Sequence, residues 1–298
     1  DDSNIFFYKD HKQWVKLSFD FGFNFIVDGR LEPEEQATDL NNLVDLYVLN
    51  SIFVTEGSKK FINYYGGQNT NAKSVWYEII GDDNGLIETS YPSQHIKETD
   101  DEKRFLIIGH SSDEIHNENF EYEIVEEQAY LEAQQFKLNN PKLAKISAKL
   151  VEEAQSHTND WSVEEETIRL IRRYVSEYIE DEYIYFEVTD PYVILEERKG
   201  DCTEHTDLFN ALLKAAGIPA RRASGYLLAD DSGAFSGHAW SEVAYDGGWV
   251  PVDATWNVWV ENSVNHLKTL KDTRLSTKNF KLRLHKIEYL DGSSAVYN

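Results

Sequence analysis

The stretch 198-RKGDCTEHTDLFNALLKAAGIPA-220 contains Cys202, the only cysteine of the 298-residue chain. Gly200 and Asp201, which precede the cysteine, interrupt the preceding hydrophobic pattern. Apolar residues then recur at helical spacing, and Gly217-Ile218-Pro219 supplies the C-cap and stop of a helix. The sequence therefore predicts a helix whose first turn carries Cys202. Unpaired backbone N–H groups and the positive end of the helix dipole favour a thiolate at such a position.

Two interpretations of Cys202 remain open at this point. The free N–H groups of a helix start could stabilise an oxyanion when the thiolate attacks a carbonyl, which favours a catalytic nucleophile. A free cysteine among apolar residues is, however, usually part of the core packing. The helix alone does not decide between a nucleophile and a buried filler.

The segment 238-HAWSEVAYDGGWVPVDAT-255 indicates a β-hairpin with a turn near Asp246-Gly247-Gly248. His238 begins its first strand, and Asp253 lies near the end of its second. A thiol nucleophile needs a base that takes its proton and a carboxylate that orients the imidazole of that base. His238 and Asp253 are therefore the candidate base and orienting carboxylate.

The length of the hairpin loop decides whether His238 reaches Asp253. A two-residue loop at Gly247-Gly248 would pair Asp253 with Glu242 and leave His238 about 13 Å away, beyond hydrogen-bond reach. A four-residue loop from Ala244 to Gly247 would pair Asp253 with His238 directly. We therefore predict the longer loop, or a β-bulge with the same effect.

Three neighbouring residues have other expected roles. Trp240 alternates onto the same strand face as the candidate base, so it is a candidate for the wall of a substrate cleft, with a place in the core as an equal alternative. His205 lies one turn after the cysteine on the same helix and is expected to pack rather than to act as the base. His266 is expected in a strand at a sheet edge, outside the site.

The segments GDCTEHTDLFNALLKAAGIPARRASGY, GHAWSEV and GWVPVDATWN, in this order, resemble the transglutaminase-like superfamily in its bacterial branch, over about residues 140 to 272. The resemblance implies a papain-like core in which Cys202 is the nucleophile, His238 the base and Asp253 the orienting carboxylate. Papain-like enzymes often place a glutamine shortly before the cysteine as an oxyanion donor. None stands here, so the backbone N–H of Cys202 is the candidate donor.

The predicted fold class is α+β, with an all-β, sandwich-like domain over residues 1–125 before the catalytic core. Segments such as 74-SVWYEII-80 and 104-RFLIIG-109 are rich in β-branched and aromatic residues and are separated by turn signals, which is typical of short strands in a sandwich. Residues 126–141 are expected to form a polar connector. Residues 142–298 are expected to form the transglutaminase-like catalytic domain.

Composition excludes several partners. A formal net charge of -24 argues against nucleic acid, because phosphates would be repelled. No apolar run is long enough to span a bilayer. One cysteine can form neither an internal disulfide nor a cysteine-based metal cage, and we predict no metal site and no cofactor. The chain starts without methionine, which favours removal of a targeting segment and export to a periplasm or the cell exterior.

Three functions follow from these residues. The first is a thiol-dependent hydrolase that acts on a peptide or protein substrate at peptide or amide bonds. The second is a protein-glutamine transglutaminase that cross-links substrates, with a lysine amine in place of water, or deamidates them. The third, of another class, is a non-catalytic cell-surface scaffold that retains the fold. The sequence does not indicate an oligomeric state.

Overall fold

The computed structural model describes residues 4–9, 13–18, 51–53, 72–82, 85, 87–88, 91, 93–109, 123–157, 161–182, 188–228, 234–260, 263–269 and 280–297. The chain divides into two compact units, one of residues 1–51 and 274–278 and the other of residues 52–273 and 279–298. In the first unit, strands β1 (Asn4–Lys9) and β2 (Gln13–Ser18) form an antiparallel hairpin. Much of the sandwich predicted for residues 1–125 lies outside the described residues.

The second unit contains a six-stranded sheet in the order β12-β11-β10-β9-β13, with β3 (Ser51–Phe53) paired to β10 off this path. Its central strands are the hairpin β10 and β11, with β9 antiparallel to β10. The strands are β9 (Ala220–Leu228), β10 (Ala234–Tyr245), β11 (Gly248–Asp253), β12 (Val258–Trp259) and β13 (His266–Lys268). This sheet carries both candidate residues of the predicted hairpin and His266.

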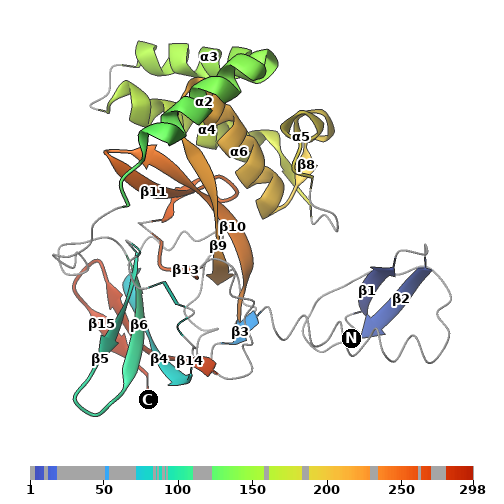
Figure 1. The fold of residues 1–298 in the computed structure, drawn as a ribbon. Coiled ribbons are helices and arrows are strands. Elements are labelled where there is room, and N and C mark those ends of the chain that lie inside the picture. The colour runs from blue at the N-terminus through green and yellow to red at the C-terminus, as the bar shows by residue number, and fades with distance from the viewer. Residues whose placement is uncertain are drawn as a thin grey trace. The chain divides into compact units, whose positions relative to one another are not determined.

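The described residues of the second unit form five helices, and α6 contacts each of the other four and also β9 and β10 (Figure 1). They are α2 (Glu127–Asn139), α3 (Pro141–Ser156), α4 (Val163–Tyr178), α5 (Pro191–Glu197) and α6 (Cys202–Ala216). The main core lies between them and the sheet, and its fully buried members include Ile168, Ile171, Leu208, Phe209 and Leu212. None of the helices in the described ranges is both long and apolar enough to cross a membrane.

Local signals in the sequence set the start of α4. Ser162 is the N-cap, and its hydroxyl accepts a hydrogen bond from the backbone N–H of Glu165 at 3.0 Å. The apolar residues Ile168, Ile171 and Val175 recur on one face of α4, and all three are fully buried. A strong cap followed by a periodic apolar face fixes this helix locally.

Residues 126–141 differ from the expected connector, because most of them form helix α2. Glutamate, glutamine, alanine and leucine are good helix formers, but here they give no clear apolar stripe. Ala133 is the one buried residue of α2, whereas Leu131 and Leu138 are exposed. The sequence did not predict this helix because its residues have high helix propensity but no amphipathic periodicity.

A five-stranded sheet in the order β15-β14-β4-β6-β5 joins distant parts of the chain (Figure 1). Strand β14 (Phe280–Tyr289) pairs antiparallel with β4 (Ala72–Gly81). The expected strands at 74–80 and 104–109 are present as β4 and β6 (Arg104–Gly109), with β5 (Gln94–Glu98) and β15 (Ser294–Val296) at the edges. The last strands of the chain thus share a sheet with residues 72–109.

Gln94 links strand β5 to the short strand β13. Its side-chain oxygen accepts from the backbone N–H of Lys268 at 2.7 Å, and its amide nitrogen donates to the carbonyl of Lys268 at 2.8 Å. The same nitrogen donates to the carbonyl of Glu88. Gln94 is 1% exposed, so these bonds are shielded from water. The backbone of β13, which carries His266, is therefore held on one side by β9 and on the other by Gln94.

Candidate active site

Cys202 is the first residue of α6, as the sequence predicts. Asp201 caps the helix by accepting from the backbone N–H of Thr203 at 2.9 Å, and Glu204 completes a capping box by accepting from the N–H of Asp201 at 3.0 Å. The N–H of His205 bonds to the carbonyl of Asp201. Within the described part of the chain, no acceptor is assigned to the N–H of Cys202, which leaves it free to face a substrate oxyanion.

The close packing of Gly200 against Glu204 explains the spacing Gly-Asp-Cys. A Cβ atom at position 200 would overlap Cβ of Glu204 and lie 2.7 Å from its Cγ. Glu204 is 1% exposed, and its second oxygen accepts from the backbone N–H of Val188 at 2.7 Å. Only glycine leaves room at position 200 for this carboxylate, which accepts from the backbone N–H groups of Asp201 and Val188.

Replacing Glu204 by alanine is expected to destabilise the protein by about 2 kcal/mol, because two partly buried backbone N–H groups lose their acceptor. It should also slow alkylation of Cys202, since the first turn of α6 loses its capping box. Urea unfolding and the iodoacetamide rate measure the two effects. Glu204→Gln keeps the shape and one acceptor oxygen and should fall between the alanine variant and the wild type. If Glu204→Ala lowers the free energy of unfolding by less than about 0.5 kcal/mol, as a typical surface substitution does, the capping box is dispensable.

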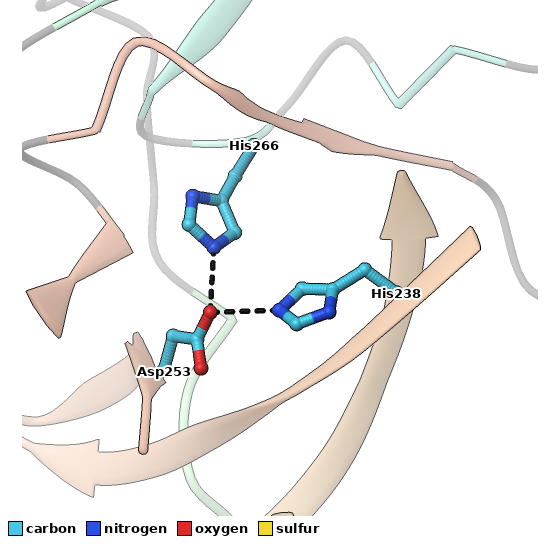
Figure 2. Close-up of side chains that lie close together, drawn as sticks. All are labelled: His238, Asp253 and His266. Carbon is cyan, nitrogen blue, oxygen red and sulfur yellow. Dashed lines mark hydrogen bonds and ion pairs between the residues drawn. The ribbon is translucent and has the colours of Figure 1, made fainter. Parts of the chain in front are cut away.

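His238 and Asp253 form the polar centre of the site (Figure 2). Nε2 of His238 lies 2.8 Å from Oδ2 of Asp253. The other carboxylate oxygen, Oδ1, accepts from the backbone N–H groups of Thr255 at 2.8 Å and Trp256 at 3.4 Å. The side chain of Asp253 is fully buried and that of His238 is 6% exposed. The carboxylate is therefore held as an acceptor on both of its oxygens.

The predicted four-residue hairpin loop is wrong. Tyr245 pairs with Gly248, so the loop is the two residues Asp246 and Gly247, with φ values of 52° and 83°. Positive φ at both positions is the signature of a type I′ turn, which fits the twist of a hairpin.

The register explains how the two side chains still meet. Ser241 opposite Val252 is the last pair of the ladder, so Asp253 follows on the face of Trp240 and not directly opposite His238. The bond between His238 and Asp253 is thus diagonal. Diagonal neighbours on one sheet face lie within reach of long side chains, which removes the need for the longer loop.

His266 belongs to the same cluster, and its expected place outside the site is wrong. Its Nε2 lies 2.8 Å from Oδ2 of Asp253, the same oxygen that His238 contacts (Figure 2). Its Nδ1 lies 2.7 Å from the hydroxyl of Ser263, and its side chain is fully buried. The segment 265-NHLKTL-270, which the sequence predicts as a strand at a sheet edge, was the available signal. Its alternation alone cannot tell which strand β13 pairs with.

The charges of the cluster differ between the two histidines. Burial alone would lower the pKa of His238, but the charge and hydrogen bond of Asp253, with further contributions from Cys202, raise it to about 10. Burial would raise the pKa of Asp253, yet His238 and the bonds from both histidines hold it well below its ordinary value. Burial and the charge of His238 lower the pKa of His266, against the opposing effect of Asp253. Asp253 therefore favours the protonated form of His238, whereas burial favours the neutral form of His266.

Cys202 completes the arrangement. Its side chain lies close enough to the imidazole of His238 to help raise the pKa of that ring. Since Nε2 of His238 is bound to Asp253, the other ring nitrogen, which points away from Asp253 in Figure 2, is the one that can take the thiol proton. Cys202 itself is partly exposed. The structure thus places His238 and Asp253 in direct contact, and the role of Cys202 as their nucleophile stays a prediction.

Trp240 lies in the core and not in the wall of an open cleft. It is 0% exposed, and its indole N–H donates to the hydroxyl of Tyr91 at 2.7 Å. Its ring centroid is 6.0 Å from that of His238 and 5.3 Å from that of His266. Trp240 therefore supports the two imidazoles from the protein side. His205 is also buried, and its Nδ1 is 2.7 Å from the carbonyl of Asp201, as expected of a packing residue.

His238, Asp253 and His266 also have the donor types of a metal site, and one ligand atom from each lies within 4.8 Å of the others. Hydrogen bonding accounts for this cluster by itself. Oδ2 of Asp253 is 2.8 Å from both ring nitrogens, which is the usual length of a charge-assisted N–H···O bond. A metal ligated at about 2.0–2.2 Å would have to displace both N–H protons from this oxygen.

Comparison with known proteins finds one family model that matches the part of the chain containing the site. Residues 148–254 match the model of the transglutaminase-like superfamily, a range that includes Cys202, His238 and Asp253. No curated protein matches the chain.

Solved structures with a similar fold are distant. A candidate cysteine protease from Cytophaga hutchinsonii is 17% identical, with a TM-score of 0.37 over 77% of this chain and 89% of that one. The periplasmic domain of TgpA from Pseudomonas aeruginosa is 15% identical, with a TM-score of 0.39 over 74% of this chain and 95% of that one. Because these scores are low, the function is inferred from the residues of the site.

Proposed function

We propose that the transglutaminase-like domain of this chain is a cysteine hydrolase of peptide or amide bonds, with Cys202 as nucleophile, His238 as acid and base, and Asp253 as the carboxylate that orients His238. The observation that supports it is the position of His238. One ring nitrogen is bound to the buried carboxylate of Asp253 at 2.8 Å, and the thiol of Cys202 interacts with the same imidazole.

The reaction begins with the thiolate of Cys202 beside the imidazolium of His238. The sulfur forms a bond to the substrate carbonyl carbon, and the carbonyl oxygen becomes an oxyanion that the N–H of Cys202 stabilises. The carbon–nitrogen bond then breaks, the proton of His238 leaves with the amine, and a thioester remains on Cys202.

Water resolves the thioester. The now neutral His238 takes a proton from a water molecule, whose oxygen attacks the thioester carbonyl. The carbon–sulfur bond breaks, the acid product leaves, and the thiolate and imidazolium are restored. Asp253, which is fully buried, keeps the imidazole oriented and stabilises its charge throughout both steps.

Alkylation of the thiol tests the proposal directly. Because the chain has one cysteine, any mass increase of the protein by iodoacetamide labelling at neutral pH reports Cys202 alone, and Cys202→Ala gives the blank. We expect rapid labelling of the wild type at pH 6 to 7 and labelling slower by about a hundredfold in His238→Ala. Equal and slow labelling of both proteins would refute the activated thiol and favour a non-catalytic scaffold.

A transglutaminase is the second candidate, because the family match covers the same three residues. In that reaction a primary amine replaces water at the thioester. A glutamine-containing peptide is incubated with the protein, with and without a primary amine, and the products are weighed. We expect cleaved or deamidated peptide in both reactions. Amine-linked peptide as the main product would replace the hydrolase proposal with the transglutaminase.

Hydrolysis is expected to persist at alkaline pH and to fall as the pH rises through about 10, where His238 loses the proton it must give to the amine. The stability of the folded protein is expected to change with pH in the same direction. Since the pKa of His238 is raised from 6.5 in the folded state, its stabilising contribution is complete below pH 6.5 and is lost as the pH rises through about 10. Values of kcat/KM and Tm between pH 6 and 11 measure both effects. An alkaline midpoint near the ordinary value of histidine would contradict the assignment.

A further inference from the structure

We propose that His266 is a positioning residue for the reaction: as a neutral histidine it donates a hydrogen bond to Oδ2 of Asp253, and so keeps this carboxylate oriented toward His238 and ionised. The inference rests on the proposed function of Cys202, His238 and Asp253. It adds a second histidine that never receives the proton of the thiol.

The hydrogen-bond pattern around His266 fixes its tautomer. Nε2 faces an acceptor-only carboxylate at 2.8 Å, so it carries the hydrogen. Nδ1 faces the hydroxyl of Ser263 at 2.7 Å, and that hydroxyl oxygen accepts from the backbone N–H of Asn265 at 3.1 Å. Ser263 can therefore donate its own hydrogen to Nδ1. In this state every polar atom of His266 has a partner, and no additional proton is needed.

The charged groups that face His266 come from two strands. Asp253, at the end of β11, draws a proton toward the ring, and the protonated His238 of β10 repels one. Burial adds to this repulsion and lowers the pKa of His266. Arg172 of α4 acts on the charge of Asp253 and not directly on His266. The two histidines that share one oxygen are thus held in different charge states.

Asp253 has four N–H partners, two on each oxygen. The backbone N–H groups of Thr255 and Trp256 fix Oδ1, whereas His238 and His266 share Oδ2. A donor to a carboxylate favours its charged form. Without His266, Oδ2 would keep a single donor, the carboxylate could rotate about its anchored oxygen, and the pKa of Asp253 would rise. The base would then lose orientation at mildly acidic pH.

The structure also shows why His266 is placed firmly enough to act this way. Its strand β13 is paired with β9 and clamped by Gln94 through both backbone polar atoms of Lys268. Its ring stands edge-on to Trp240, with 5.3 Å between centroids and 84° between planes. Main-chain bonds and ring packing therefore limit the movement of its Nε2 relative to Asp253.

The test compares His266→Phe, which keeps a ring without a donor, with His266→Gln, whose amide can replace the Nε2 donor. We expect His266→Phe to slow both Cys202 alkylation and hydrolysis about tenfold at pH 5 to 6, and to move the acid midpoint of both profiles upward by about one pH unit. His266→Gln should recover most of the rate and most of the midpoint. All rates are taken at a temperature well below Tm for each variant.

The outcomes separate the two proposals. Wild-type alkylation that does not depend on His238 refutes the proposed function. If that dependence is present but His266→Phe keeps the wild-type midpoint, only the role of His266 is refuted. Equal defects in His266→Phe and His266→Gln, with a lower Tm and an unmoved midpoint, would also refute it, because they indicate packing alone. Should both variants fail to fold, Ser263→Ala replaces them, since it removes the partner of Nδ1; an unmoved midpoint there overturns the proposal.

Discussion

Asp253→Asn is expected to lower kcat/KM about ten-thousandfold, the loss typical of a catalytic histidine deprived of its carboxylate. The structure gives a reason beyond the missing charge. Asp253 accepts two backbone N–H groups on one oxygen and two imidazole N–H groups on the other. Asparagine must turn its NH2 group toward one of these pairs. The NH2 group would then face N–H donors, with no acceptor, in a buried site.

The same variant should lose about 3–5 kcal/mol of stability, because it leaves the charge of His238 buried without its counter-charge. The measurements are kcat/KM, the iodoacetamide rate and urea unfolding at pH 7. Asp246→Asn is a matched control with the same chemical change, placed in the hairpin turn at φ 52°, where asparagine is well tolerated. If Asp253→Asn keeps its activity within tenfold of wild type, the orienting role of this carboxylate is wrong.

Gly225→Ala is expected to destabilise the protein by about 3 kcal/mol and to reduce hydrolysis strongly, although residue 225 contacts no substrate. Gly225 lies in β9 between His238 of β10 and Lys268 of β13. A Cβ atom there would overlap the carbonyl oxygen of Leu267 and lie 2.5 Å from Cη2 of Trp240. Both neighbours are fully buried, so the added methyl group has no space to enter.

The expected consequence is a shift of β13 away from β9, which carries the Nε2 donor of His266 away from Asp253. Thermal unfolding and kcat/KM measure the effect. Gly237→Ala is the matched control in the adjacent strand, since a Cβ atom there meets nothing within 4 Å. Equal stability of the two variants would show that the sheet yields at Gly225 without cost.

The start of α6 could be predicted from sequence because its signals are local. Asp201 caps the helix, Gly217 ends it with φ 94°, and the apolar residues between them are buried. Such features depend on neighbours a few residues apart, and a short window contains them all. The pairing of His238 with Asp253 was likewise predictable as a relation between two ends of one hairpin.

Features that depend on distant pairing could not be predicted. The predicted register of the hairpin was wrong because a diagonal contact between two side chains satisfies the same chemistry as a direct one. The contact of His266 with Asp253 could not be predicted because β13 has three residues and pairs with β9, some forty residues earlier. Strand β14 pairs with β4, about two hundred residues earlier in the chain. The alternating pattern of β14 does not identify the strand with which it pairs.

The strand order has a practical consequence for dissecting the protein. The family match ends at residue 254, and therefore includes Cys202 and Asp253 but stops before β13. A fragment trimmed to that boundary would expose the edge of β9 and leave Oδ2 of Asp253 with one imidazole instead of two. Minimal versions of the domain should extend at least through Thr269 and keep Gln94, because the smallest segment with the three candidate catalytic residues is not the smallest complete site.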